Sequence, residues 1–217
     1  MIIGGILAGL NWVFNLILPA SVTNALIIIA LVIITGAMHL DGLSDTCDGI
    51  AGHKTVEERW KVMHDSHAGA FGVVGVILAL LVQYTALNNI PADKMTAMLL
   101  FMPMVSRWAT VYAIFSFPYA RPTGLGKVYK EATRWPQFAV ATIITLAIAG
   151  ALFPLFNVTG FIVFGGVLII TTGLAFYFKY KFAGLTGDTY GAINEVAEVI
   201  TLLLIIIIAT KAPGLIG

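Results

Sequence analysis

Three aspartates within eight residues carry the clearest chemistry in this sequence. Asp41, Asp45 and Asp48 lie in the stretch HLDGLSDTCDG, residues 39–49. If a helix continues through this stretch, the spacing i, i+4, i+7 brings the carboxylates within an arc of roughly 60°. Carboxylates on one stripe repel one another unless a cation lies between them, and oxygen ligands favour Mg²⁺, Mn²⁺ or Ca²⁺ over zinc. The spacing therefore predicts a divalent-cation site on this stripe.

Acidic residues are concentrated around this stretch. Six of the eleven lie between positions 41 and 65, in a chain that is otherwise poor in charge. The alternative interpretation, a solvated helix end with three surface acids, leaves this concentration unexplained. Asp65 is a fourth candidate metal ligand or a proton acceptor, and the neighbouring His64 and His67 could bind metal, bind phosphate or transfer a proton. As residues at the end of a helix, the two histidines could also be inert.

A short amphipathic helix is predicted just before this second cluster. Thr55 and Glu58 have the spacing of a capping box, and apolar side chains then alternate with charged ones. Such a helix could lie in the membrane interface, with Trp60 as its anchor.

Other polar residues stand out against apolar surroundings. Arg107 lies within a long apolar segment, where an arginine normally faces an acid, a cavity or an anionic ligand. We expect it to contact a substrate phosphate, and a structural ion pair is the alternative. A basic loop suits an anion site, and a later helix face carries three acids. These residues are Arg121, Gly124, Gly126 and Lys127 in the loop, and Asp188, Glu195 and Glu198 on the helix.

The elements that must position these residues are membrane helices. The 217 residues are 59% hydrophobic and 11% charged, whereas a soluble domain is about 45–50% apolar and roughly 25% charged. The net charge of +1 implies no nucleic-acid partner, and the single Cys47 excludes an intrachain disulfide. We predict an all-α, polytopic helix bundle with about seven transmembrane helices plus the interfacial helix. The expected spans are residues 2–18, 23–40, 69–87, 95–117, 136–156, 160–178 and 192–210.

The connections between these spans predict which side carries the chemistry. The three long ones are residues 41–68, 118–135 and 179–191, and their alternation puts all three on the same side. They contain nine of the twelve lysines and arginines, Lys54 among them. The positive-inside rule makes this side cytoplasmic, and we expect both chain ends outside. No internal repeat or linker is visible, so residues 1–217 are predicted to form one domain in the cell membrane.

The order of the motifs resembles the cobalamin synthase family, the adenosylcobinamide-GDP ribazoletransferases. One departure is the beginning, because family members usually carry an extra segment before the first helix, and here Met1 opens directly into it. The blocks that carry the resemblance are residues 39–49, Asp65-Ser66-His67-Ala68-Gly69, Ser106-Arg107-Trp108, Gly124-Leu125-Gly126, and residues 186–192 followed by Glu195 and Glu198.

The resemblance implies a reaction and a set of roles. The family joins adenosylcobinamide-GDP to α-ribazole or its 5′-phosphate and releases GMP, which completes the nucleotide loop of cobalamin. It implies Mg²⁺ on the aspartates, with the reaction facing the cytoplasm and the lipid bilayer as a partner. A second copy of the chain, in a homo-oligomer, is a further possible partner. Substrate and phosphate binding would fall to His39, Arg107, Arg121, Gly124, Gly126, Lys127, Asp188, Glu195 and Glu198.

A more distant likeness concerns the CDP-alcohol phosphotransferases, whose motif also begins D-x-x-D-G, as at Asp45 to Gly49. That motif ends with two aspartates four residues apart. Here only Asp65 matches, because Gly69 occupies the last position, so the proton acceptor is open between Asp65, His64 and His67. A lipid CDP-alcohol phosphotransferase and a divalent-cation transporter are the alternative functions. The transporter expects acids near the bilayer centre rather than at one face.

Overall fold

The computed structural model describes residues 1–52, 55–152 and 157–211, and within them the chain is all α. Lys54 and the end of the span expected at 136–156 lie outside the described residues. The helices are α1 (Ile2–Asn15), α2 (Ala20–Ile34), α3 (Met38–Ile50), α4 (Val56–Met63), α5 (Ala70–Leu87), α6 (Ala92–Ser116), α7 (Leu125–Ala132), α8 (Trp135–Ala151), α10 (Thr159–Phe182) and α11 (Gly187–Lys211).

The helix lengths confirm a polytopic membrane protein. Four helices, α5, α6, α10 and α11, are long and apolar enough to cross a bilayer, and the bent pair of α2 and α3 would make a fifth crossing. The expected seven spans exceed this number because α1 and α8 are shorter apolar helices of 14 and 17 residues. A crossing needs about 20 residues.

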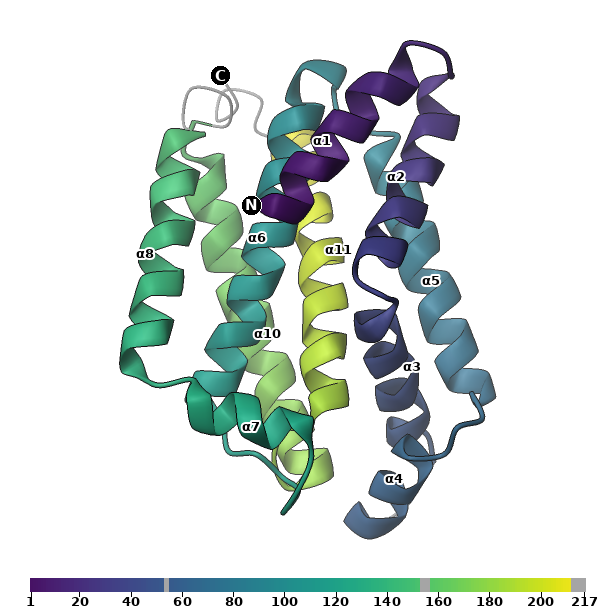
Figure 1. Cartoon of the computed structure of the whole chain (residues 1–217), viewed down its shortest axis with the longest axis vertical. Helices are drawn as coiled ribbons and strands as arrows, with labels where there is room; N and C mark the ends of the chain where they lie inside the picture. Colours follow the sequence, from purple (N-terminus) through teal and green to yellow (C-terminus); the bar gives the residue numbers. More distant parts are fainter. Residues whose placement is uncertain (53–54, 153–156, 212–217) are drawn as a thin grey trace.

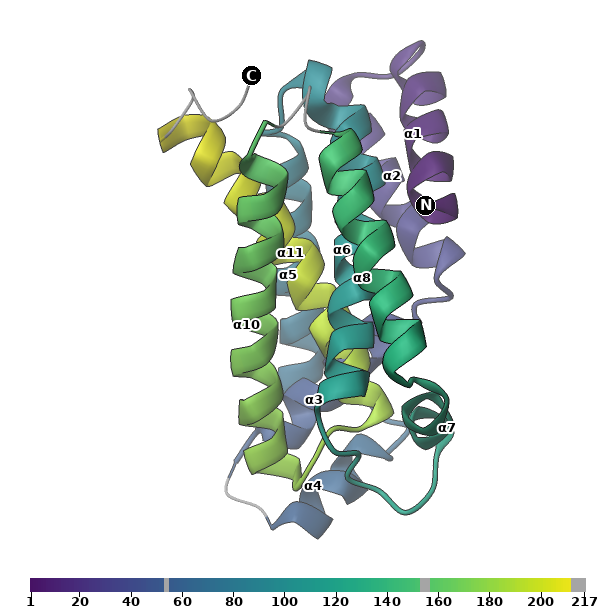
Figure 2. The same cartoon turned by 90° about the vertical axis from the view of Figure 1, so that its left-hand side faces the viewer.

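Helix α11 runs through the middle of the bundle and packs on α3, α5, α6 and α10 (Figures 1 and 2). Its side chains are buried along most of its length, as are those of α6. Large exposed apolar side chains are spread over α1, α5, α8 and α10 instead. An apolar exterior around a partly polar interior suits a lipid surrounding.

The chain bends sharply between α2 and α3. Gly36 and Ala37 have φ angles of 61° and 57°, in the left-handed region. The two helices meet at 87°, so the span expected at residues 23–40 is broken near its end, and the aspartate stretch forms a separate helix. A left-handed residue cannot continue a right-handed helix. Asp41, Asp45 and Asp48 nevertheless share α3 with the predicted helical spacing.

The three long connections lie together at one end of the bundle, as predicted (Figures 1 and 2). The loop before α7 pairs with the turn before α11 through Ala120 N–H to Leu185 O, 2.8 Å, and Leu185 N–H to Pro118 O, 2.9 Å. Helix α4 joins them because the Trp60 indole donates to Phe182 O at 3.2 Å. Trp60 is thus held by the protein, where the sequence suggested a membrane anchor.

The direction of α1 corrects one expectation about the chain ends. Helix α2 runs toward the end that carries α4 and α7, so α1 runs away from that end, starting partway along the bundle (Figure 1). The expectation that both chain ends lie on the opposite side is therefore wrong for the N-terminus. Helix α11 does run from the shared end to the opposite one.

Candidate active site

Two glycines bring the aspartate helix against the start of α11. A Cβ on Gly42 would lie 2.7 Å from Asp188 O, and a Cβ on Gly191 would lie 3.1 Å from His39 O. Side chains at these positions would force α3 and α11 apart, since such contacts are shorter than van der Waals distance. The close approach places the carboxylates of α3 next to Asp188.

Asp41, Asp45 and Asp65 line a common polar cavity of about 270 Å³. Asp41 and Asp45 come from α3, and Asp65 comes from the segment that follows α4. Within the described part of the chain, Asp41 and Asp45 accept no hydrogen bond and form no ion pair. Their oxygens are free for a hard cation, which fits the Mg²⁺ predicted from the sequence. The rest of the lining is Ser44, Met63, His64, Ser66 and Ala68.

In the described chain, the carboxylates that line the polar cavity are not arranged as a complete set of metal ligands. Among residues 1–52, 55–152 and 157–211, no group of three or more His, Cys, Asp or Glu side chains is close enough to hold one ion. The cavity therefore offers the donor atoms that Mg²⁺ requires, and holding an ion there would require these side chains to turn toward it.

Asp48 points elsewhere. Its two carboxylate oxygens accept hydrogen bonds from Gly69 N–H at 2.8 Å and Gly72 N–H at 2.9 Å, at the first turn of α5. A Cβ at either glycine would overlap this carboxylate. A carboxylate at a helix N-terminus satisfies unpaired N–H groups and the positive end of the helix dipole. Asp48 is therefore committed to holding α5 against α3.

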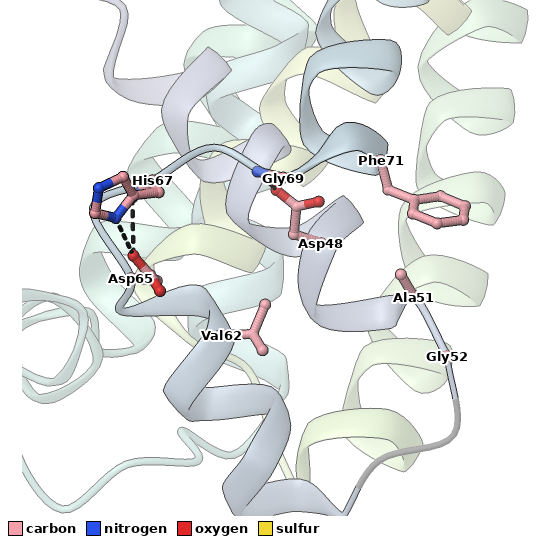
Figure 3. A pocket seen from close by; sticks show the side chains of 8 residues that line it. All are labelled: Asp48, Ala51, Gly52, Val62, Asp65, His67, Gly69 and Phe71. Carbon is pink, nitrogen blue, oxygen red and sulfur yellow. Dashed lines mark hydrogen bonds and ion pairs between the residues drawn. The ribbon is translucent and has the colours of Figure 1, made fainter.

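Asp65 and His67 form a hydrogen-bonded pair (Figure 3). The Asp65 Oδ1 accepts from the His67 backbone N–H at 3.0 Å and from its Nδ1 at 2.8 Å. These contacts hold the pKa of Asp65 below its usual range, so the carboxyl is ionised at neutral pH. Because Nδ1 must donate to a carboxylate, the exposed Nε2 of a neutral His67 keeps its lone pair.

His64 has no such free nitrogen. Its Nδ1 lies 2.8 Å from Trp60 O, which can only accept, so Nδ1 carries the proton. Its Nε2 lies 3.2 Å from Nη1 of Arg121 and accepts from it. The same arginine donates from Nη2 to Asp188 Oδ2 at 3.1 Å. Arg121 thus joins the end of α4 to the start of α11 at the rim of the polar cavity.

The sequence interpretation missed Arg59. This side chain on α4 is 6% exposed and donates to three carbonyls at the C-terminal end of α3: Gly49 O at 2.6 Å, Ile50 O at 2.9 Å and Gly52 O at 3.1 Å. Gly49 O and Ile50 O are carbonyls that a helix end leaves without a partner, and Gly52 lies in the segment just after α3. The signal was available, because Arg59 lies three residues after Val56 and four before Met63, on the apolar face of the helix.

A second polar group is buried between α5, α6 and α11, away from the aspartate cavity. Arg107 forms an ion pair with Glu198, which is 1% exposed. Glu198 also accepts from Gln83, Ser106 and Asn194, and Gln83 reaches Glu195 as well. The structure thus shows the ion pair that the sequence offered as the alternative for Arg107. Its Nη2 is buried with no partner among the described residues.

Gln83 was also missed, although an amide within an apolar span is a detectable signal. His39, at the start of α3, is half-buried. Its backbone lies where α3 meets α11, because a Cβ on Gly191 would lie 3.1 Å from His39 O.

Gly124 and Gly126, at the start of α7, allow this helix to approach the start of α11 closely. A Cβ on Gly126 would lie 2.7 Å from the Tyr119 ring and 3.0 Å from Gly187 N. Gly124 has a φ of 122°, which favours glycine. Lys127 donates to Pro122 O at 2.7 Å and lies 3.9 Å from Glu131. The loop is shaped by these contacts, and Lys127 remains partly exposed at its surface.

Comparison with known proteins gives one consistent result. A family described as cobalamin-5-phosphate synthase matches residues 1–206. Relatives named adenosylcobinamide-GDP ribazoletransferase include that of Geotalea daltonii, 37% identical over 96% of this chain and 83% of the relative. Those of a Roseiflexus species (37%, covering 93% and 74%) and Desulforamulus reducens (36%, covering 95% and 82%) are also similar. No solved structure matches this chain.

Proposed function

This chain belongs to the cobalamin-5-phosphate synthase family and is an adenosylcobinamide-GDP ribazoletransferase of cobalamin biosynthesis, and we propose that the transfer takes place at the cavity lined by Asp41, Asp45 and Asp65. The observation that carries this proposal is the pair of α3 carboxylates that line a polar cavity without any described partner. Three other carboxylates near the helix contacts are already engaged: Glu198 pairs with Arg107, Asp188 pairs with Arg121, and Asp48 accepts from backbone N–H groups.

The donor is adenosylcobinamide-GDP and the acceptor is α-ribazole or its 5′-phosphate. A ribose hydroxyl oxygen of the acceptor forms a bond to the phosphorus attached to the cobinamide arm. The bond between this phosphorus and the oxygen bridging to GMP breaks, and its electron pair leaves with GMP. Such a transfer depends on positioning and on stabilising charge at the leaving oxygen.

Asp41, Asp45 and Asp65 would hold Mg²⁺ in this cavity, with Mn²⁺ as a substitute. Bound there, the metal would neutralise the diphosphate and stabilise the charge that develops on the GMP oxygen. Asp48 is assigned to positioning instead of direct ligation, because both its oxygens already accept from the first turn of α5. Its effect on the site is indirect, through the packing of α3 and α5.

His67 is the better candidate for the proton acceptor. Its Nε2 has no partner in the described chain, and Asp65 orients the ring through Nδ1. The proton of the attacking hydroxyl would pass to this Nε2. His64 is less suited, since its Nε2 already accepts from Arg121. We assign His64 to holding Arg121.

Phosphate contacts are proposed for the cations at the rim. Arg121 contacts His64, which lines the cavity, and in the described chain the Nε of Arg121 has no partner. Lys127, Gly124 and Gly126 form the adjoining loop. Arg107 lies deeper and is held by Glu198, so any contact with phosphate would require a rearrangement of this ion pair; Glu195 and Glu198 would act through Arg107.

The protein is an integral membrane protein, and we propose that the end carrying α4 and α7 faces the cytoplasm. The excess of lysine and arginine in the long connections supports this orientation. The donor carries a charged diphosphate and the acceptor is a polar nucleoside or its 5′-phosphate, so a site at the membrane surface suits them better than one at the bilayer centre.

Purified protein in detergent, given adenosylcobinamide-GDP, α-ribazole and Mg²⁺, should release GMP and form the cobalamin product together. Asp41→Asn and Asp45→Asn should each abolish both products and leave the protein folded. Full activity in both variants would contradict the placement of the active site at this cavity. Release of CMP from a CDP-alcohol, or cation flux in liposomes without nucleotide, would favour the alternative functions.

A further inference from the structure

A second cavity adjoins the polar one and shares Asp65 with it. It measures about 450 Å³ and lies between the end of α3, α4 and the start of α5. Figure 3 shows the hydrogen-bonded Asp65 and His67 on one side and Phe71 with Ala51 on the other. The lining comprises Asp48, Ala51, Gly52, Val62, Asp65, His67, Gly69 and Phe71.

The walls of this cavity differ from those of its neighbour. Ala51, Val62 and Phe71 present apolar surface, and Phe71 is 65% exposed. Asp48 adds little free polarity, because both its oxygens are taken by backbone N–H groups. Free hydrogen-bonding groups gather at the Asp65 and His67 side. The cavity is thus apolar over one wall and polar at one edge, which is the pattern of a small-molecule site.

The two substrates of the proposed reaction differ in charge and polarity, as the two cavities do. The donor brings a diphosphate, whose charge suits a cation held among free carboxylates. The acceptor is a ribonucleoside, with a flat aromatic base at one end and ribose hydroxyls at the other. A cavity of about 450 Å³ is of the size that small-molecule ligands fill, whereas the corrinoid of the donor is far larger than a nucleoside.

We propose that this second cavity, which we term the acceptor cavity, binds the ribonucleoside acceptor. The aromatic base packs against Phe71, Val62 and Ala51, and the ribose turns toward Asp65 and His67. Because Asp65 lines both cavities, an attacking hydroxyl at this edge faces the phosphorus of the donor. This assignment rests on the proposed function and adds the location of its second substrate.

The test separates the Michaelis constants of the two substrates. Phe71→Ala removes the aromatic wall, and Ala51→Trp fills the cavity from the same apolar side. Ala51 has extended backbone angles that any residue can adopt. Phe161→Ala serves as the matched control, because Phe161 is an exposed phenylalanine of α10, outside both cavities.

Phe71→Ala should raise the KM for α-ribazole about tenfold, since an aromatic contact with its buried area contributes on the order of 1.4 kcal/mol. Ala51→Trp should raise it further, and the KM for adenosylcobinamide-GDP should stay at the wild-type value in both. Equilibrium dialysis of α-ribazole without donor should show the same order, with the highest affinity in wild type and the lowest in Ala51→Trp. Because dialysis measures binding without turnover, it also applies to a variant with a low kcat. The control should match wild type throughout.

An unchanged affinity for α-ribazole in both folded variants would overturn the assignment. A rise in the KM for the donor with an unchanged KM for the acceptor would indicate that this cavity binds the donor, and it would also overturn the assignment. Failure of the proposed function would look different, because wild-type protein would then release no GMP, or Asp45→Asn would retain full activity. The dialysis experiment reports on the acceptor cavity in either case.

Discussion

The Asp48 carboxylate on α3 accepts a hydrogen bond from the Gly72 backbone N–H in α5, at 2.9 Å, and a second bond from Gly69 accompanies it at 2.8 Å. This contact fixes the start of α5 against the aspartate helix. Asp45, only three residues earlier, has no such partner in the described chain. Two aspartates of one motif thus have different surroundings, and they should respond differently to substitution.

Asp48→Ala should destabilise the protein, because two N–H groups at the start of α5 lose a charged acceptor. The expected loss is about 2–3 kcal/mol in the free energy of unfolding, measured by thermal unfolding in detergent. Asp41→Asn is the matched control, and it should leave the unfolding midpoint at or above that of wild type. An Asp48→Ala protein as stable as wild type would contradict the positioning role.

Arg59→Met should also act through stability. The methionine keeps apolar contact with the core and leaves three carbonyls at the end of α3 without their donor, at a cost of about 2–3 kcal/mol. Lys61→Met, at an exposed position of the same helix, controls for the loss of charge. Equal unfolding midpoints for the two variants would show that the carbonyl contacts contribute nothing.

Glu198→Gln should leave the Arg107 guanidinium without its counter-charge. Removing one partner of a buried pair typically costs 3–5 kcal/mol, and we expect about 3 kcal/mol because 27% of the Arg107 side chain is exposed. The double variant Arg107→Met with Glu198→Gln should recover part of this loss.

The same double variant tests the predicted phosphate contact of Arg107. If the arginine is structural, the variant that regains stability should also regain the KM for adenosylcobinamide-GDP. If it contacts phosphate during turnover, stability should return while that KM stays raised. A double variant no more stable than Glu198→Gln alone would contradict the ion-pair account itself.

His67→Gln should lower kcat about 100-fold or more, the range of a lost proton acceptor, with both KM values close to wild type. His64→Gln should affect the donor KM instead, because His64 holds Arg121 at the rim. Comparable kcat losses in the two variants would contradict the assignment of the proton acceptor to His67.

Much of the site could be predicted because helical spacing and charge patterns are local. The spacing of Asp41, Asp45 and Asp48 correctly gave a shared helix, and the capping box at Thr55 forms as predicted. The shared side of the three long connections followed from their alternation. The family resemblance is confirmed by the match over residues 1–206.

The rest depends on contacts between distant segments. The spacing of α3 cannot reveal that Asp48 turns to Gly69 while Asp45 does not, because that choice is made by how α5 packs. The bend at Gly36 and Ala37 was not predicted, because their positive φ angles depend on how α2 and α3 pack in the bundle. The contact that occupies Nε2 of His64 likewise comes from Arg121, which lies 57 residues further along the chain.

The most direct measurement is product formation by wild type, Asp45→Asn and Asp48→Asn across a Mg²⁺ titration, with an EDTA control. GMP and the cobalamin product should appear together in wild type and vanish with EDTA. Asp45→Asn should remain folded and inactive at every Mg²⁺ concentration, whereas Asp48→Asn should retain activity at temperatures below its lowered unfolding midpoint. Equal GMP formation by Asp45→Asn and wild type, or wild-type activity unaffected by EDTA, would contradict a metal-dependent transfer in the cavity of Asp41, Asp45 and Asp65.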